Sequence, residues 1–319
     1  MAASCAFALA GGAWAQSPSA PAYPSRAVKW IVPFAAGGSG DTIARLLAER
    51  MGAALGQPVL IDNRGGNGSV LGTEAAAKAA ADGHTWVLSN GAAITTGPLM
   101  GQATTYRPLE DFVHVTLIGS FTNALIVRQD HPAKNLQDFL ALARSQPGKL
   151  SYGSAGVGSA GFLTGEMLKQ LAQVDMVHIP YKGSSPAVAA LLADESQLMI
   201  GNLPPWSAQI KAGKIQALAV TTAKRHPSLP DVPALAEALP GFETVAWFGV
   251  LAPAATPKAV VDRMNAVINH ALDQADVKAR LATLACDPAP GTPEAFAQRV
   301  NTDVARWKKL ASERNIRAD

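Results

Sequence analysis

"LSYGSAGVGSAGFLTGEML", Leu150 to Leu168, passes from an extended apolar stretch through a glycine-rich turn into a helical pattern. Gly156, Gly158 and Gly161 have the G-x-G-x-x-G spacing of a dinucleotide-binding turn, a weak signal in a chain with 28 glycines. A dinucleotide site also needs an acidic residue about 20 positions further on, at the end of the next strand. The next extended stretch ends instead in a tyrosine and a lysine, so the nicotinamide enzyme is set aside.

A second glycine-rich turn stands between an expected strand and an expected helix. "VPFAAGGSGD", Val32 to Asp41, also leads from an apolar strand through glycines into a helix. Helix N-termini present unpaired N–H groups and about half a positive charge, and glycine lets a carboxylate approach the backbone. Two such turns suit a ligand with an anionic group at one or both ends. The alternative, that glycine only permits tight strand-to-helix turns, stays open for each loop.

The rest of the chain alternates extended runs with helical patterns, which predicts parallel sheets with crossover helices. The first α/β unit has expected strands at 28–34, 58–64 and 85–90 and expected helices at 41–55 and 70–81. The second has expected strands at 149–153, 176–183, 196–205 and 215–222 and expected helices at 135–145, 162–171 and 185–194. A mostly helical tail, 258–317, has no sheet of its own to cover, so we expect it to pack on the first unit.

The 319 residues have room for two domains of usual size. The chain crosses between the two units twice, near 121–127 and near 244–251. We therefore expect one lobe to comprise 26–123 and 248–319, and the other to comprise 124–247. In such sheets the ligand lies beyond the carboxyl ends of the strands, so the two glycine-rich turns would face each other between the lobes.

The N-terminal stretch "MAASCAFALAGGAWAQSPSAP" reads as a signal peptide over 1–15, ending in a small-x-small cleavage site, and a linker over 16–25. We expect export to the periplasm and a soluble mature protein; acylation of Cys5 stays open as an alternative. Cleavage would leave Cys286 alone, which excludes a disulfide framework and predicts a buried, inert thiol.

The charged residues give no sign of a nucleic-acid or membrane-surface partner, because 27 Lys and Arg against 24 Asp and Glu are scattered without a block of like charge. The six histidines show no i, i+4 pair and have no Cys partner, so we expect no metal and no cofactor. No oligomeric interface is evident either, and we expect a monomer.

Seven stretches in order, among them "VPFAAGGSGD", "IDNRGGNGSVLGTEAAAKAAADGHT", "HIPYKGSSPAVAALL" and "LAPAATPKAVVDRMN", resemble the periplasmic substrate-binding receptors of tripartite tricarboxylate transporters, the Bug-type receptors. The resemblance spans nearly all of the mature chain. It implies a two-lobe periplasmic-binding-protein fold, each lobe a mostly parallel sheet flanked by helices. It also implies a receptor without catalysis that captures a small carboxylate-bearing solute and delivers it to a membrane permease.

The resemblance also implies that two loops clasp the ligand from opposite lobes, through backbone amides, small hydroxyls and waters. In this sequence the first loop corresponds to Phe34, Ala36, Gly37, Gly38, Ser39 and Asp41. The second loop corresponds to Ser154, Ala155, Gly156, Gly158 and Ser159. The turn after the third strand, with Ser89, Asn90 and Ala92, and the later Asn202 should line the same cleft.

Two positions depart from the family pattern: Phe162 stands where a histidine is common, and Gly201 stands where an acid is usual. An imidazole and a carboxylate are thereby lost near the cleft, so the ligand of other members does not transfer. We expect Asp41 to be an N-cap rather than a contact to the ammonium group of an amino-acid ligand. Trp206 and Trp247 fit packing better than stacking on a ligand.

The competing function is an exported serine hydrolase, with Ser39 or Ser159 as nucleophile. Nothing in the sequence ties a histidine and a carboxylate to either serine, and there is no G-x-S-x-G elbow. The identity of the solute stays open among dicarboxylates, tricarboxylates, aromatic acids, amino acids and amides.

Overall fold

The computed structural model describes residues 23–99, 101–202, 206, 209–210, 212–227 and 229–314. The predicted signal peptide, 1–15, and positions 16–22 of the predicted linker lie outside these residues. Among the helices described, none combines the length and the apolar character that a membrane crossing requires.

Each lobe is built on three parallel strands, as the alternating pattern predicted. The fourth strand expected in the second unit, at 215–222, does not join them and pairs antiparallel with a crossing strand instead. In the first lobe the order is β2 (Val59–Asn63), β1 (Val28–Val32) and β3 (Thr85–Asn90). In the second lobe the order is β7 (Leu198–Asn202), β5 (Leu150–Ser154) and β6 (Met176–Pro180). The flanking helices are α1 (Ser39–Leu55) and α2 (Val70–Ala77) in the first lobe, and α4 (Leu136–Ser145), α5 (Ala160–Ala172), α6 (Ser184–Leu192) and α8 (Leu235–Ala238) in the second.

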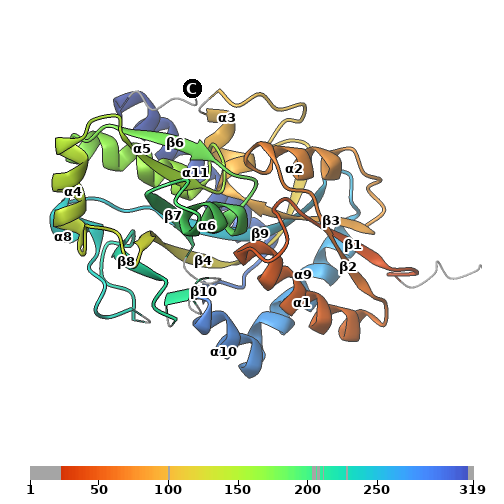
Figure 1. Ribbon diagram of the computed structural model, residues 1–319. Coiled ribbons are helices and arrows are strands. Elements are labelled where there is room, and N and C mark those ends of the chain that lie inside the picture. The colour runs from red at the N-terminus through yellow and green to blue at the C-terminus, as the bar shows by residue number, and fades with distance from the viewer. Residues whose placement is uncertain are drawn as a thin grey trace, which may run out of the picture.

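Two long antiparallel strands join the lobes (Figure 1). They are β4 (Phe112–Arg128) and β9 (Val245–Pro253), which pair with each other, for example Thr122 with Val245. Strand β9 also pairs with β3, while β4 pairs with β7 and with β8 (Ile215–Val220). One continuous sheet therefore runs through both lobes in the order β2-β1-β3-β9-β4-β7-β5-β6.

Separate hydrophobic cores mark the two lobes. Large buried side chains of the first are Trp30, Leu47, Trp86 and Phe248, and those of the second are Phe139, Tyr152, Leu168 and Phe242. Apolar helix faces pack on apolar strands in both, which is the main stabilising term in such a layered fold.

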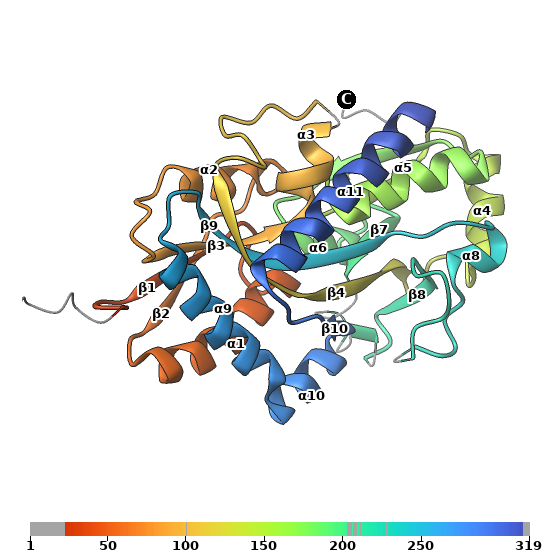
Figure 2. The same ribbon diagram turned by 180° about the vertical axis from the view of Figure 1, so that it is seen from behind.

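The C-terminal tail comprises α9 (Lys258–Asp273), α10 (Ala275–Thr283), β10 (Cys286–Pro288) and α11 (Pro293–Arg314). Helix α9 packs against α1 and β4, as expected for a tail on the first lobe. Two features were not expected. Strand β10 pairs with β4, and α11 runs across the back of the sheet toward α5 (Figure 2), so that Trp307 joins the core of the second lobe. The tail therefore contacts both lobes.

Candidate ligand-binding site

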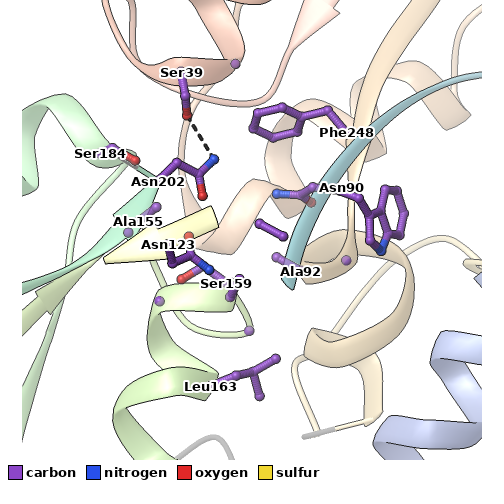
Figure 3. Close-up of a pocket in the computed structure, with 18 of the residues that line it drawn as sticks. Ser39, Asn90, Ala92, Asn123, Ala155, Ser159, Leu163, Ser184, Asn202 and Phe248 are labelled. Atoms are coloured by element: carbon purple, nitrogen blue, oxygen red, sulfur yellow. Dashed lines mark hydrogen bonds between the residues drawn. The ribbon is translucent and has the colours of Figure 1, made fainter. Parts of the chain in front are cut away.

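A cavity lies between the lobes, and both crossing strands contribute residues to its wall (Figure 3). The space between its lining atoms, together with the open solvent at its mouth, is about 680 Å³. The first lobe contributes the turns after β1 and β3, the second contributes the turn after β5 and the starts of α5 and α6, and the crossing strands form the floor. This is the edge at which the carboxyl ends of the parallel strands meet, where ligands of open α/β sheets bind.

The described wall carries no charged side chain, because none of its residues is Asp, Glu, Lys, Arg or His. Three helices begin in it: α1 at Ser39, α5 at Ala160 and α6 at Ser184. The first turn of each helix has N–H groups without an intrahelical acceptor, and each N-terminus carries about half a positive charge. The backbone therefore makes the cavity attractive to an anion.

The first loop is held from behind by Asp41. Helix α1 begins at Ser39 after the N-cap Gly38, so the expectation that Asp41 is an N-cap was wrong. Its carboxylate, buried in the first turn, accepts hydrogen bonds from the Gly37 N–H at 2.9 Å and from Arg45 Nε at 3.0 Å. Asp41 thus reaches back along the chain and fixes the glycine turn.

Asn63 completes this support. Its Nδ2 donates to Asp41 Oδ1 at 2.9 Å and to the Phe34 carbonyl at 3.2 Å. Burial by itself raises the pKa of Asp41, but the hydrogen bonds from Arg45, Gly37 and Asn63 outweigh it and hold that pKa below its usual value. The carboxyl is therefore ionised at neutral pH, and it stabilises the loop that faces the cavity.

The second loop is ordered by two serines. Ser159 caps α5, because its hydroxyl accepts from the Phe162 N–H at 3.2 Å. Ser154, fully buried, lies 2.7 Å from His178 Nε2 through its Oγ and accepts from the Gly156 N–H at 3.1 Å. Burial lowers the pKa of His178 to about 4, so this imidazole is neutral at pH 7. The Ser154–His178 pair holds the turn in shape.

Nine of the fifteen residues expected to bind ligand line the cavity: Phe34, Gly38, Ser39, Asn90, Ala92, Ala155, Gly158, Ser159 and Asn202. The other six do not form its wall: Ala36, Gly37, Asp41, Ser89, Ser154 and Gly156. Asp41 and Ser154 support the two loops instead. Direct ligand contact stays a prediction for all fifteen.

Several wall residues were missed by sequence reasoning, above all Asn123 in the floor and Trp307 on α11. An amide inside the apolar crossing segment was a signal that could have singled out Asn123. Trp247 lines the cavity and also packs, with its Nε1 donating to Asp303 Oδ2 at 2.6 Å. Trp206 and Phe162 pack in the core of the second lobe.

The lobes touch each other around the cavity. The Ala35 N–H donates to the Lys182 carbonyl at 3.1 Å, and Asn202 Nδ2 donates to Ser39 Oγ at 3.1 Å, a bond visible in Figure 3. The Thr96 hydroxyl, in the segment after β3, donates to the Gly158 carbonyl in the turn after β5, which is a further bond between the lobes. The structure therefore holds the two lobes in a closed arrangement. Lys182 contributes its carbonyl, while its side chain is exposed and outside the wall.

Other reactive groups lie away from the cavity. In the part of the chain that the structure describes, no group of three or more His, Cys, Asp or Glu residues could hold a metal ion. Cys286 is a free, buried thiol, and burial raises its pKa well above the usual range.

Comparison with known proteins places this architecture in a family. The model of the tripartite tricarboxylate transporter family receptor matches residues 43–316. BugT of Bordetella pertussis (strain Tohama I) is 35% identical over 297 residues, covering 92% of this chain and 91% of BugT.

Solved structures of similar proteins support the same family assignment. An R. palustris protein with adipate is 36% identical with a TM-score of 0.89, over 92% of this chain and 98% of that one. MatC from Rhodopseudomonas palustris with bound malate is 34% identical with a TM-score of 0.86, over 90% and 99%. The resemblance drawn from the sequence motifs is confirmed, and the chain belongs to the tripartite tricarboxylate transporter receptor family.

Proposed function

We propose that this chain is a periplasmic receptor that captures a small organic acid between its lobes and delivers it, as a monomer, to the membrane permease of a tripartite transporter. The observation that carries the proposal is the cavity itself: its described wall has no charged side chain, and the first residues of three helices form part of it. Two relatives with adipate and malate support the carboxylate as the captured group.

The proposed capture has two steps. The solute's carboxylate first docks on the free N–H groups at the start of one helix, in the open molecule. Closure then brings the other loop to the far end of the solute and forms the contacts between Ala35 and Lys182 and between Ser39 and Asn202. Because no cationic side chain of the described wall anchors the anion, affinity depends on solute length and on how fully the closed cavity excludes water.

The lobe boundaries belong to the same proposal. We assign 26–123 and 248–319 to one lobe and 124–247 to the other, which places the hinge in β4 and β9 where they pair at Thr122 and Val245. The buried clusters near the two crossings support this division, since Phe121 and Phe248 belong to one core and Leu125 and Phe242 to the other; Trp307 of the tail is an exception, because it packs in the second core.

The receptor is proposed to bind without catalysis. Of the two serines weighed as nucleophiles, Ser39 accepts from Asn202 and Ser159 caps α5. The serine–histidine pair of Ser154 and His178 has its hydroxyl fully buried behind the wall and bonded within its own turn. Nothing in this arrangement favours the hydrolase.

Thermal unfolding of the mature protein with a panel of aliphatic di- and tricarboxylates, aromatic acids, amino acids and amides tests the proposal. A solute at about 1,000 times its Kd should add roughly 4 kcal/mol of stability, a rise of several degrees in Tm. A rise confined to carboxylates is expected. No rise with any carboxylate, or turnover of a generic ester, would refute the receptor. Delivery is tested by solute uptake in cells with and without the receptor.

A further inference from the structure

The floor of the cavity contains an amide with no partner. Asn123, on β4, has no exposed surface, and neither its Oδ1 nor its Nδ2 makes a hydrogen bond. It lines the cavity (Figure 3). Buried polar side-chain atoms almost always have a partner, and leaving them unpaired destabilises the fold. An amide with both ends unpaired in the wall of a ligand cavity points to a partner that enters the cavity and reaches the amide as the lobes close around it.

Its neighbour on β7 shows the contrast. Asn123 pairs with Asn202 in the antiparallel ladder of β4 and β7, so the two side chains project from the same face of the sheet. Asn202 uses its Nδ2 to bond Ser39 of the other lobe. The backbone of Asn123 is also in use, because its carbonyl accepts from the Thr221 N–H at 3.0 Å. Its side-chain amide, by contrast, has no hydrogen-bond partner.

The chemistry of an amide limits the group that fits it. An asparagine side chain presents one donor end and one acceptor end, and this holds whichever way the amide is turned. A carboxylate only accepts, so it would satisfy Nδ2 and repel Oδ1. An ammonium only donates and would satisfy Oδ1 alone. A hydroxyl or a carboxamide both donates and accepts, and can satisfy both ends.

We propose that Asn123 is a specificity-determining residue that binds a hydroxyl or carboxamide carried by the acid, so that the solute is a hydroxy acid or an acid amide and not a plain dicarboxylate. This inference rests on the proposed function. The helix N-termini bind the carboxylate, and the amide in the floor binds the group that distinguishes one acid from another.

The test is isothermal titration of the mature protein with matched solutes: succinate against malate and succinamate, glutarate against 2-hydroxyglutarate and glutaramate, and adipate against adipamate. The wild type should bind a hydroxy or amide member about 10- to 100-fold more tightly than the plain diacid of the same length. Which of the two is preferred identifies the group.

Asn123→Leu should reduce this affinity ratio to about one. If the Asn123→Leu protein does not fold, Asn123→Ala takes its place in the test. Asn202→Leu is the matched contrast: it removes the bond to Ser39 and should weaken every solute similarly, leaving the ratio in place. The apo Tm of Asn123→Leu should equal or exceed that of the wild type, because an unpaired buried amide is replaced by an apolar side chain of similar size.

A wild-type ratio near one with tight binding of a plain diacid would overturn the inference and leave the receptor intact, as would an unchanged ratio in Asn123→Leu. Failure of every carboxylate to bind would refute the proposed function, and the inference with it.

Discussion

Closure of the lobes can be blocked at one atom. Gly68 of the first lobe faces Val157 of the second so closely that a Cβ on residue 68 would lie 2.1 Å from the Val157 carbonyl oxygen. Contacts of this kind below 3.0 Å are essentially never seen, so the facing loops of a Gly68→Ala variant must part by about 1 Å. In the proposed open molecule the Val157 carbonyl is withdrawn with its lobe, and only the end of the flexible Gln102 side chain, 2.9 Å from that Cβ, has to move.

The effect on binding follows from the bonds that this separation breaks. The Thr96–Gly158 contact is next to Val157, and the Ala35–Lys182 bond, 3.1 Å long, would exceed hydrogen-bond length after a shift of about 1 Å. Two bonds worth about 0.5–1.5 kcal/mol each amount to about 1–3 kcal/mol lost from the closed state. Kd should therefore rise about 5- to 150-fold.

A matched control separates closure from backbone strain. Gly68 has φ +57°, where alanine is strained by about 1–2 kcal/mol. Gly56, at the end of α1 in the same lobe, has φ +66°, and no atom lies within 4 Å of the place a Cβ would take, so Gly56→Ala shares the strain without the clash. Without solute, both variants should lose similar unfolding free energy in urea. Titration should then show weakened binding in Gly68→Ala alone. Equal affinity in the two variants would mean that the bound state does not make this contact.

Further predictions concern the support of the first loop by Asp41, the titration of the buried His178, the tryptophan fluorescence of the cavity wall and the accessibility of the Cys286 thiol. Asp41→Asn should lower the unfolding free energy by about 1–3 kcal/mol at pH 7; since the pKa of Asp41 is lowered, urea titrations should show this difference vanishing as pH falls below about 4. Because the pKa of folded His178 is about 4 against a usual 6.5, its contribution to stability is present above pH 6.5 and is lost as pH falls toward 4; Tm curves of His178→Gln parallel to wild type would contradict this. Solute binding should shift tryptophan emission, and replacing Trp247 and Trp307 by Phe should abolish the shift. Cys286 should react with thiol reagents only as fast as the chain unfolds, and rapid labelling of the native protein would show that it is accessible.

Local pattern was enough for most of the fold. The periodicity of 41–55 and the apolar runs at 28–34 and 85–90 predicted α1, β1 and β3 because these elements bury apolar faces whose spacing is written in the chain. The start of α1 was misplaced by two residues, since Asp41 looks like an N-cap in sequence while its real partner, the Gly37 N–H, lies outside the helix. The π-helical segment η2 (Ala92–Thr96) was missed, because its isoleucine and threonines favour strands over helices.

The sequence by itself determined the two α/β lobes, the family and the glycine turns where helices begin, because turn chemistry and apolar periodicity act over a few neighbouring residues. Only the tertiary structure decided which residues face the cavity: Asn123 and Asn202 lie side by side through the pairing of β4 with β7, and Trp307 reaches the wall from the far end of the chain. Contacts between residues this distant depend on strand register and on the packing of one lobe against the other, which no short stretch of sequence specifies.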